Sequence, residues 1–290
     1  MADIGLFYAA CIWGATFFLV KGALTDIDPV TLVAYRFLLA GTILFVYLVI
    51  KRRPVFEGFG RALFLSFILW VEYISQTVGL RFTTASNSGF ITGLFVAFIP
   101  IFLRFIFNHT PTLFEWFASI VALAGLWVLT GGLQQVNIGD LLTLAAAVTY
   151  ALHVLYSDKY MKGGVDPIMI SCQQFLLVGL MSLATALILN LPLGVRTLSA
   201  GGVVLFLALF PTLSAFVIQM FAQRMTSPVK VSMIFAFEPV FAALFAWTLG
   251  GETFTRNSIF GGLLIFAALI LAGLRSKQQE HLTVNNGGVN

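Results

Sequence analysis

Two acidic side chains lie deep inside apolar stretches of about 20 residues, the length that crosses a hydrocarbon bilayer. They are Glu72 and Glu238, two of the twelve Asp and Glu residues in the sequence. An ionisable group at the bilayer centre costs about 2.5–3.5 kcal/mol on insertion scales, so each needs a reason to be there. Such a carboxylate is able to bind an ammonium group or to carry a proton. A structural hydrogen bond between helices is the alternative for each.

Glu72 begins a polar stripe on one predicted helix. Gln76 follows four positions later, so both side chains point to the same side of that helix. Trp70 and Tyr73 flank the stripe with aromatic surface. This arrangement is typical of a cavity wall that binds an ammonium group, with interhelical hydrogen bonding as the alternative.

A second polar and aromatic face is formed by Thr149, His153 and Tyr156, with Tyr150 at its edge. His153 has the chemistry to bind substrate or to relay protons near pH 7. A satisfied interhelical hydrogen bond explains it equally well. No second His or Cys lies at ligand spacing, so we expect neither a metal site nor another cofactor.

Further candidates are spread over other apolar stretches. Gln219 must find a partner in lipid, and Trp13 is able to stack on a planar substrate; ordinary helix packing is the alternative for both. We interpret Arg36 as mainly structural, because its side chain is long enough to snorkel or to pair. Pro100 and Pro239 predict helix kinks that shape a cavity.

The composition explains why these groups must sit in helices that cross a membrane. Of the 290 residues, 59% are hydrophobic and only 10% are charged, which excludes a soluble enzyme, a disordered chain and a nucleic-acid binder. The apolar runs predict ten transmembrane helices in an all-α integral membrane protein. These spans are residues 3–22, 29–50, 61–80, 84–106, 112–130, 139–159, 167–189, 201–222, 228–249 and 257–274.

The basic residues predict the orientation of the spans. If the N-terminus is cytoplasmic, eleven Lys and Arg residues fall inside and four outside, with Arg36 within a span. We therefore expect both termini in the cytoplasm, in the cell (inner or plasma) membrane.

An internal repeat divides the chain into two halves. Asp28-Pro29 is followed by Phe37-Leu38-Leu39 and Gly41, and Asp166-Pro167 is followed at identical spacing by Phe175-Leu176-Leu177 and Gly179. The segment 97–102 matches 236–241 in the same order. These matches predict a first repeat at 1–137, a second at 138–275 and a polar cytoplasmic tail at 276–290. Five crossings per half invert the second repeat, which is typical of secondary transporters.

Several of these motifs together resemble the EamA-type branch of the drug/metabolite transporter superfamily. They are Trp13-Gly14, Arg36-Phe37, the segments around Pro100 and Pro239, and Gly251-Glu252-Thr253. The resemblance covers about residues 3–275. It implies a ten-helix bundle, a cavity lined mainly by spans 1, 3, 4, 6, 8 and 9, and export of amino acids or other small metabolites. Asn108-His109-Thr110 stands where the second half has Gly251-Glu252-Thr253, so no role of a first-half acidic residue is carried over.

The sequence therefore predicts a secondary transporter that works by alternating access and is not an enzyme, since no nucleophile or metal motif lies in the spans. We expect it to export amino acids, including aromatic or other neutral ones, with protons as a candidate coupling ion. No nucleic-acid partner is expected, and the protein is interpreted as a monomer or homodimer in the lipid bilayer. A passive channel and a membrane receptor are the alternatives. The candidate substrate-binding residues are Trp13, Trp70, Glu72, Tyr73, Gln76, Tyr150, His153, Gln219 and Glu238.

Overall fold

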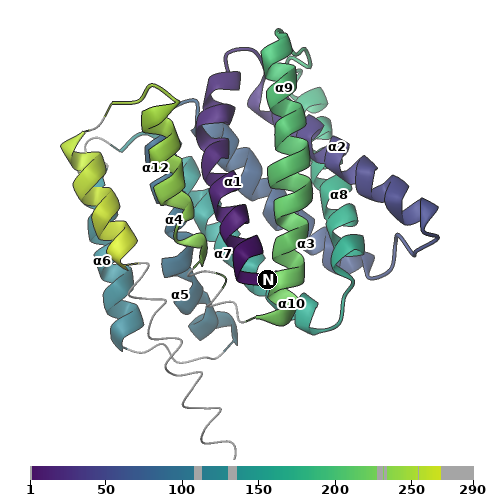
Figure 1. Ribbon diagram of the computed structural model, residues 1–290, viewed down its shortest axis with the longest axis horizontal. Helices are drawn as coiled ribbons and strands as arrows, with labels where there is room; N and C mark the ends of the chain where they lie inside the picture. The colour runs from purple at the N-terminus through teal and green to yellow at the C-terminus, as the bar shows by residue number, and fades with distance from the viewer. Residues whose placement is uncertain are drawn as a thin grey trace, which may run out of the picture.

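The computed structural model describes residues 2–107, 113–129, 136–226, 231, 234–253 and 255–268 as a bundle of helices (Figure 1), and these residues contain no strand. In chain order the elements are α1 (Ala2–Ala23), α2 (Pro29–Ile50), α3 (Phe59–Gly79), α4 (Ala85–Gly93), α5 (Phe95–Phe107), α6 (Leu113–Leu129), α7 (Ile138–Lys162), α8 (Pro167–Ile188), α9 (Leu198–Leu207), the π-helix η2 (Ala208–Ala215), α10 (Phe216–Met225) and α12 (Glu238–Thr248). A further helix covers Arg256–Ala268.

Seven helical stretches of the described residues are long and apolar enough to cross a membrane. They are Ala2–Ala23, Pro29–Ile50, Phe59–Gly79, Ala85–Ile106, Ile138–Lys162, Pro167–Ile188 and Leu198–Met225. The other three predicted spans contain the shorter helices α6, α12 and Arg256–Ala268. The prediction of an all-α membrane protein is confirmed, while the count of ten spans depends in part on residues outside the described ranges.

Two predicted spans whose residues are all described are not continuous α-helices. The span predicted at 84–106 is divided at Leu94 into α4 and α5. The span predicted at 201–222 contains η2, which includes Pro211 and lies between α9 and α10. Proline removes a backbone donor, and π-helical turns are frequent at functional sites. At η2 the carbonyl oxygen of Pro211 accepts a hydrogen bond from a side chain of α1.

The duplicated motifs occupy matching places where α2 packs against α8. A Cβ atom on Gly41 would lie 2.8 Å from the backbone nitrogen of Leu176, and one on Gly179 would lie 2.8 Å from that of Leu38. From Leu38 to Gly41 on α2 the chain advances by three residues, while the contacting residue on α8 goes back by three, from Gly179 to Leu176. The two helices therefore run antiparallel. This is the relation that inverted repeats require for their second spans. The packing of α3 on α7 is likewise matched by the packing of α10 and η2 on α1.

The connections between the helices gather at two opposite ends of the bundle. At the first, which we call the Asp28 end, Thr197 donates to the Asp26 carboxylate at 3.0 Å and Thr31 donates to the carbonyl of Pro192 at 2.9 Å. This end comprises 24–28, 80–84, 136–137, 189–197 and 249–253. At the opposite Asp166 end, residues 51–58 lie against 163–166 and the start of α8. Successive spans therefore carry the chain back and forth between two ends.

Candidate functional site

A small cavity lies at the middle of the bundle, between α1, α3, α7, α10 and α12. Its walls consist of Trp13, Thr16, Glu72, Tyr73, Gln76, Tyr150, Phe216 and Glu238. The volume left between these side chains is about 20 Å³, enough for about one water molecule. The side chains therefore leave little free space around a polar centre in this conformation.

Local backbone features bring Trp13 and Glu238 to this centre. The chain turns at 236–237, so Glu238 begins α12 with Pro239 in the first helical turn. The positive end of a helix dipole favours a carboxylate there, and proline has no hydrogen bond to lose. A Cβ atom on Gly14 would lie 2.9 Å from the Glu238 carbonyl oxygen, so only glycine lets α1 approach α12 this closely. That approach places the neighbouring Trp13 in the cavity wall.

The two glutamates of the cavity are buried and incompletely paired. Glu72 and Glu238 are each 5% exposed, and the Oε2 atom of each has no hydrogen-bond partner. The hydroxyl of Tyr150 lies within hydrogen-bonding reach of the Glu238 carboxyl group. Among the described residues, ion pairs form only at helix ends, and neither glutamate belongs to one. The cavity thus presents two carboxyl oxygens whose hydrogen-bonding capacity is unused.

Aromatic rings enclose the rest of the cavity. The indole N–H of Trp13 donates to the Pro211 carbonyl of η2 at 2.9 Å, which fixes the ring. Phe216 packs edge-on against Trp13, with ring centroids 5.6 Å apart. Tyr150 stacks on Phe95 at 4.2 Å. Rings held in this way form an apolar wall around the polar centre.

The structure brings six of the nine predicted site residues together. Trp13, Glu72, Tyr73, Gln76, Tyr150 and Glu238 line the cavity. Trp70, His153 and Gln219 do not: Trp70 stacks near Phe67, and the imidazole of His153 bonds the amide of Gln174 at 2.8 Å. Gln219 is fully buried, and neither its side-chain nitrogen nor its oxygen has a partner.

Three residues near the centre were not predicted to take part in it. Thr16 lies one turn from Trp13 and lines the cavity, as does Phe216, which shares a helix face with Gln219. That shared face was the only signal in the sequence that pointed to Phe216. Arg36, interpreted from the sequence as structural, is 2% exposed and lies 4.8 Å from the ring centroid of Tyr73.

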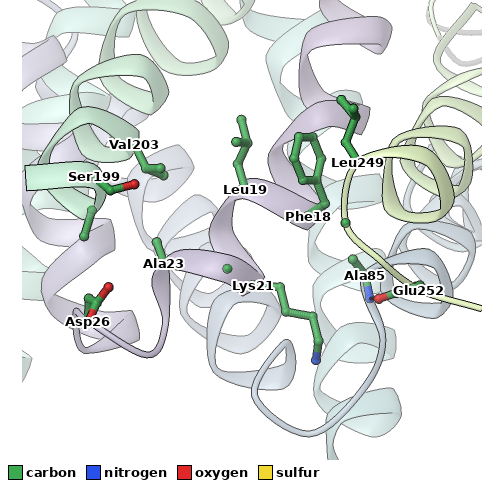
Figure 2. Close-up of a pocket in the computed structure, with 13 residues that line it drawn as sticks. Phe18, Leu19, Lys21, Ala23, Asp26, Ala85, Ser199, Val203, Leu249 and Glu252 are labelled. Carbon is green, nitrogen blue, oxygen red and sulfur yellow. Dashed lines mark hydrogen bonds between the residues drawn. The ribbon is translucent and has the colours of Figure 1, made fainter. Parts of the chain in front are cut away.

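Two larger hollows of about 410 and 550 Å³ lie at the Asp28 end, and Glu252 lines both. Figure 2 shows the first, with Glu252 beside Ala85 and with Lys21 on α1 nearby. The Glu252 carboxylate accepts hydrogen bonds from the backbone nitrogens of Ala85 at 2.5 Å and Ser86 at 3.1 Å, so it caps α4. No residue lines both a hollow and the central cavity. The centre is therefore separate from the hollows of the Asp28 end.

The described residues contain no group of three or more His, Cys, Asp or Glu side chains that is able to hold a metal ion. The candidate site is thus a small polar and aromatic cavity inside a bundle of membrane-length helices. Fold and site together define a multi-pass membrane protein with a small central cavity.

Comparison with known proteins gives the family. The model of the EamA-like transporter family matches residues 1–131 and again 137–274, so this chain belongs to that family. An uncharacterized transporter of Archaeoglobus fulgidus is 32% identical over 94% of this chain and 86% of its own length. The uncharacterized inner membrane transporter YedA of Escherichia coli is 27% identical over 92% and 89%. A solved crystal structure with 18% identity has a TM-score of 0.73 and covers 96% of this chain and 98% of its own, which supports the fold. The protein is a membrane transporter.

Proposed function

We propose that this protein is a secondary transporter that exports amino acids, including aromatic and other neutral ones, by alternating access. The observation that carries the proposal is the small central cavity in which Glu72 and Glu238 each have an unpartnered carboxyl oxygen. A substrate ammonium group supplies the donors and the positive charge that these oxygens lack. The surrounding rings of Trp13, Tyr73 and Phe216 would hold the substrate side chain.

Alternating access is supported by the repeated architecture. We propose that residues 1–137 and 138–275 act as two halves that rock around the cavity, with 276–290 as a tail. The antiparallel contact of α2 with α8 lies between these halves. Inverted repeats of this kind give two similar conformations that open to opposite sides of the membrane.

Proton coupling by Glu72 or Glu238 is part of the proposal. The two carboxyls face each other, and Arg36 on α2, Tyr73 on α3 and Tyr150 on α7 also face them. If either glutamate carries the proton, Glu72→Gln or Glu238→Gln should abolish the dependence of uptake on a pH gradient. Unchanged dependence in both variants would remove that role, while leaving substrate binding to be measured separately.

The location follows from the charge distribution. We propose the cell (inner or plasma) membrane with both termini cytoplasmic, which puts the Asp166 end inside. Single cysteines introduced at 57 and 195, with Cys11 and Cys172 replaced by Ala, are expected to react with a membrane-impermeant maleimide only at 195 in intact cells. The opposite pattern would reverse the orientation. The protein is proposed to act as a monomer or homodimer.

The main alternative, a passive channel, requires a continuous water-filled path. The small volume of the cavity, about 20 Å³, favours a carrier instead, because a solute larger than water needs a conformational change to fit there.

The test is counterflow in proteoliposomes loaded with unlabelled amino acid and supplied with the labelled compound outside. We expect saturable, transient accumulation of aromatic and other neutral amino acids. Flux that rises linearly with concentration would indicate a channel. No accumulation of any amino acid by folded protein would contradict the proposed substrate class.

A further inference from the structure

A buried guanidinium group lies beside the cavity without a counter-ion. Arg36 on α2 belongs to none of the ion pairs of the described residues, and its Nη2 atom has no hydrogen-bond partner. A charged group that is removed from water is costly unless it is paired. Glu72, the acid on the facing helix α3, interacts with Arg36 electrostatically but lies beyond ion-pair distance. This arginine therefore retains a donor and a charge for a partner that the described residues do not supply.

The guanidinium group is held in a defined orientation. Its Nε donates to Thr212 Oγ1 at 2.9 Å, and Thr212 in turn donates to the carbonyl oxygen of Leu207 at 2.7 Å. Its Cζ atom lies 4.8 Å from the ring centroid of Tyr73, a residue that lines the cavity. Hydrogen bonding on one edge and ring stacking on its plane leave the Nη2 edge free. Such an orientation suits recognition of a planar anion rather than filling of space.

We propose that Arg36 binds the carboxylate of the substrate and thereby makes the transporter select zwitterions over amines. This inference rests on the proposed function, because it concerns the same cavity. The glutamates then bind the ammonium group, and Arg36 binds the negative group of the same molecule once the halves move apart. Arginine is the residue best suited to this task, because its N–H groups match the two oxygens of a carboxylate.

The proposal makes a sharp distinction between ligands. A zwitterion pairs with both kinds of buried charge, whereas an amine of the same shape leaves the guanidinium unpaired. A carboxylic acid without the amine leaves the glutamates unpaired. A hydrogen bond to a charged group is worth about 1.5–3 kcal/mol, which corresponds to roughly tenfold to 150-fold in affinity.

The experiment measures competition against counterflow of labelled phenylalanine by unlabelled phenylalanine, 2-phenylethylamine and 3-phenylpropanoate. For the wild type we expect both analogues to compete at least about tenfold more weakly than phenylalanine. Arg36→Gln should weaken competition by phenylalanine about tenfold or more and leave competition by 2-phenylethylamine nearly unchanged. Arg81→Gln makes the same chemical change at the Asp28 end and should keep the wild-type preference.

The outcomes separate this inference from the proposed function. If the wild type carries phenylalanine but 2-phenylethylamine competes equally well, the amino-acid function stands and the role of Arg36 is overturned. If Arg36→Gln keeps the wild-type preference for phenylalanine over 2-phenylethylamine, the role of Arg36 is likewise overturned. If the folded wild type carries no amino acid, the proposed function itself fails. Should Arg36→Gln fail to fold, Arg36→Lys tests the point, because it keeps the charge but loses the planar fork, and a reduced preference for phenylalanine is expected.

Discussion

Among the described residues, ion pairs join charged side chains only at the ends of the bundle, whereas the ionisable side chains at its centre belong to none. At the Asp28 end, Arg81 pairs with Asp28 at 3.1 Å, and Glu252 caps α4; at the Asp166 end, Arg53 pairs with Asp166. At the centre, Glu72 keeps an unpartnered atom, as Glu238 and Arg36 also do. Water surrounds the helix ends and solvates charged side chains there, so such a side chain does not need an ion-pair partner. In the membrane interior an unpaired charge is costly, so the contrast suggests different roles.

In the proposed function, the end charges hold helices in place, and the central ionisable groups bind the substrate. This division predicts that substitutions at the centre impair transport more than stability, while substitutions at the ends do the reverse.

Neutralising a central glutamate should have the largest effect. We expect Glu238→Gln to reduce the rate of counterflow about tenfold to 100-fold, because the charged acceptor for the substrate ammonium is lost. The amide keeps nearly the same shape, so the unfolding temperature in detergent should stay the same or rise. Glu57→Gln, on the exposed connection between α2 and α3, is the matched control and should transport normally. Normal counterflow by Glu238→Gln would contradict the proposed difference between the centre of the bundle and its ends.

Crowding the α2–α8 contact should be the next largest effect. Gly41→Ala places a Cβ atom 2.8 Å from the backbone nitrogen of Leu176, so the helices must shift. We expect a loss of about 1–3 kcal/mol in the free energy of unfolding, and the same for Gly179→Ala. Gly202→Ala, whose Cβ atom would meet nothing within 4 Å, is the control and should be neutral or slightly stabilising. Equal stability of the three variants, measured by thermal unfolding, would show that the close approach does not matter.

Removing the cap at α4 should have a moderate effect on stability. Glu252→Ala leaves the backbone nitrogens of Ala85 and Ser86 without their acceptor. The expected loss is about 0.5–2 kcal/mol, and the ratio of phenylalanine to 2-phenylethylamine competition should not change. A changed substrate preference with unchanged stability would show that Glu252 takes part in substrate binding and does not act only as a helix cap.

Breaking the pair at the Asp166 end should have the smallest effect. Both side chains are partly exposed, at 40% for Arg53 and 32% for Asp166. Arg53→Gln is expected to lower the free energy of unfolding by at most about 1 kcal/mol, and less at high salt. A loss larger than that of Glu252→Ala would mean that this end is held more tightly than its exposure suggests.

Much of the fold could be predicted because its signals are local. Apolar runs of membrane length mark the helices, and the Asp-Pro pairs mark two of their starts. In the structure the carboxylates of Asp28 and Asp166 accept hydrogen bonds from the backbone nitrogens of Val30 and Ile168, each at 2.9 Å. The division at Leu94 and the π-helix were missed, because they depend on how neighbouring helices compete for backbone groups.

The site could be predicted only in part, because periodicity shows which residues share a face but not which faces meet. Glu72 and Gln76 are four residues apart and both reach the cavity. Trp70 is two residues from Glu72, and side chains at that spacing point in different directions along a helix. His153 bonds to Gln174 on the next helix, a contact between elements that the sequence pattern does not specify.

The most direct test of the account is equilibrium binding of labelled phenylalanine to purified protein in detergent, comparing the wild type with Glu72→Gln and Glu57→Gln. If the unpaired centre is the substrate site, the wild type and Glu57→Gln bind saturably with equal affinity, and Glu72→Gln binds at least about tenfold more weakly. Binding by Glu72→Gln that equals the wild type would contradict the account, because the substrate would then be held elsewhere.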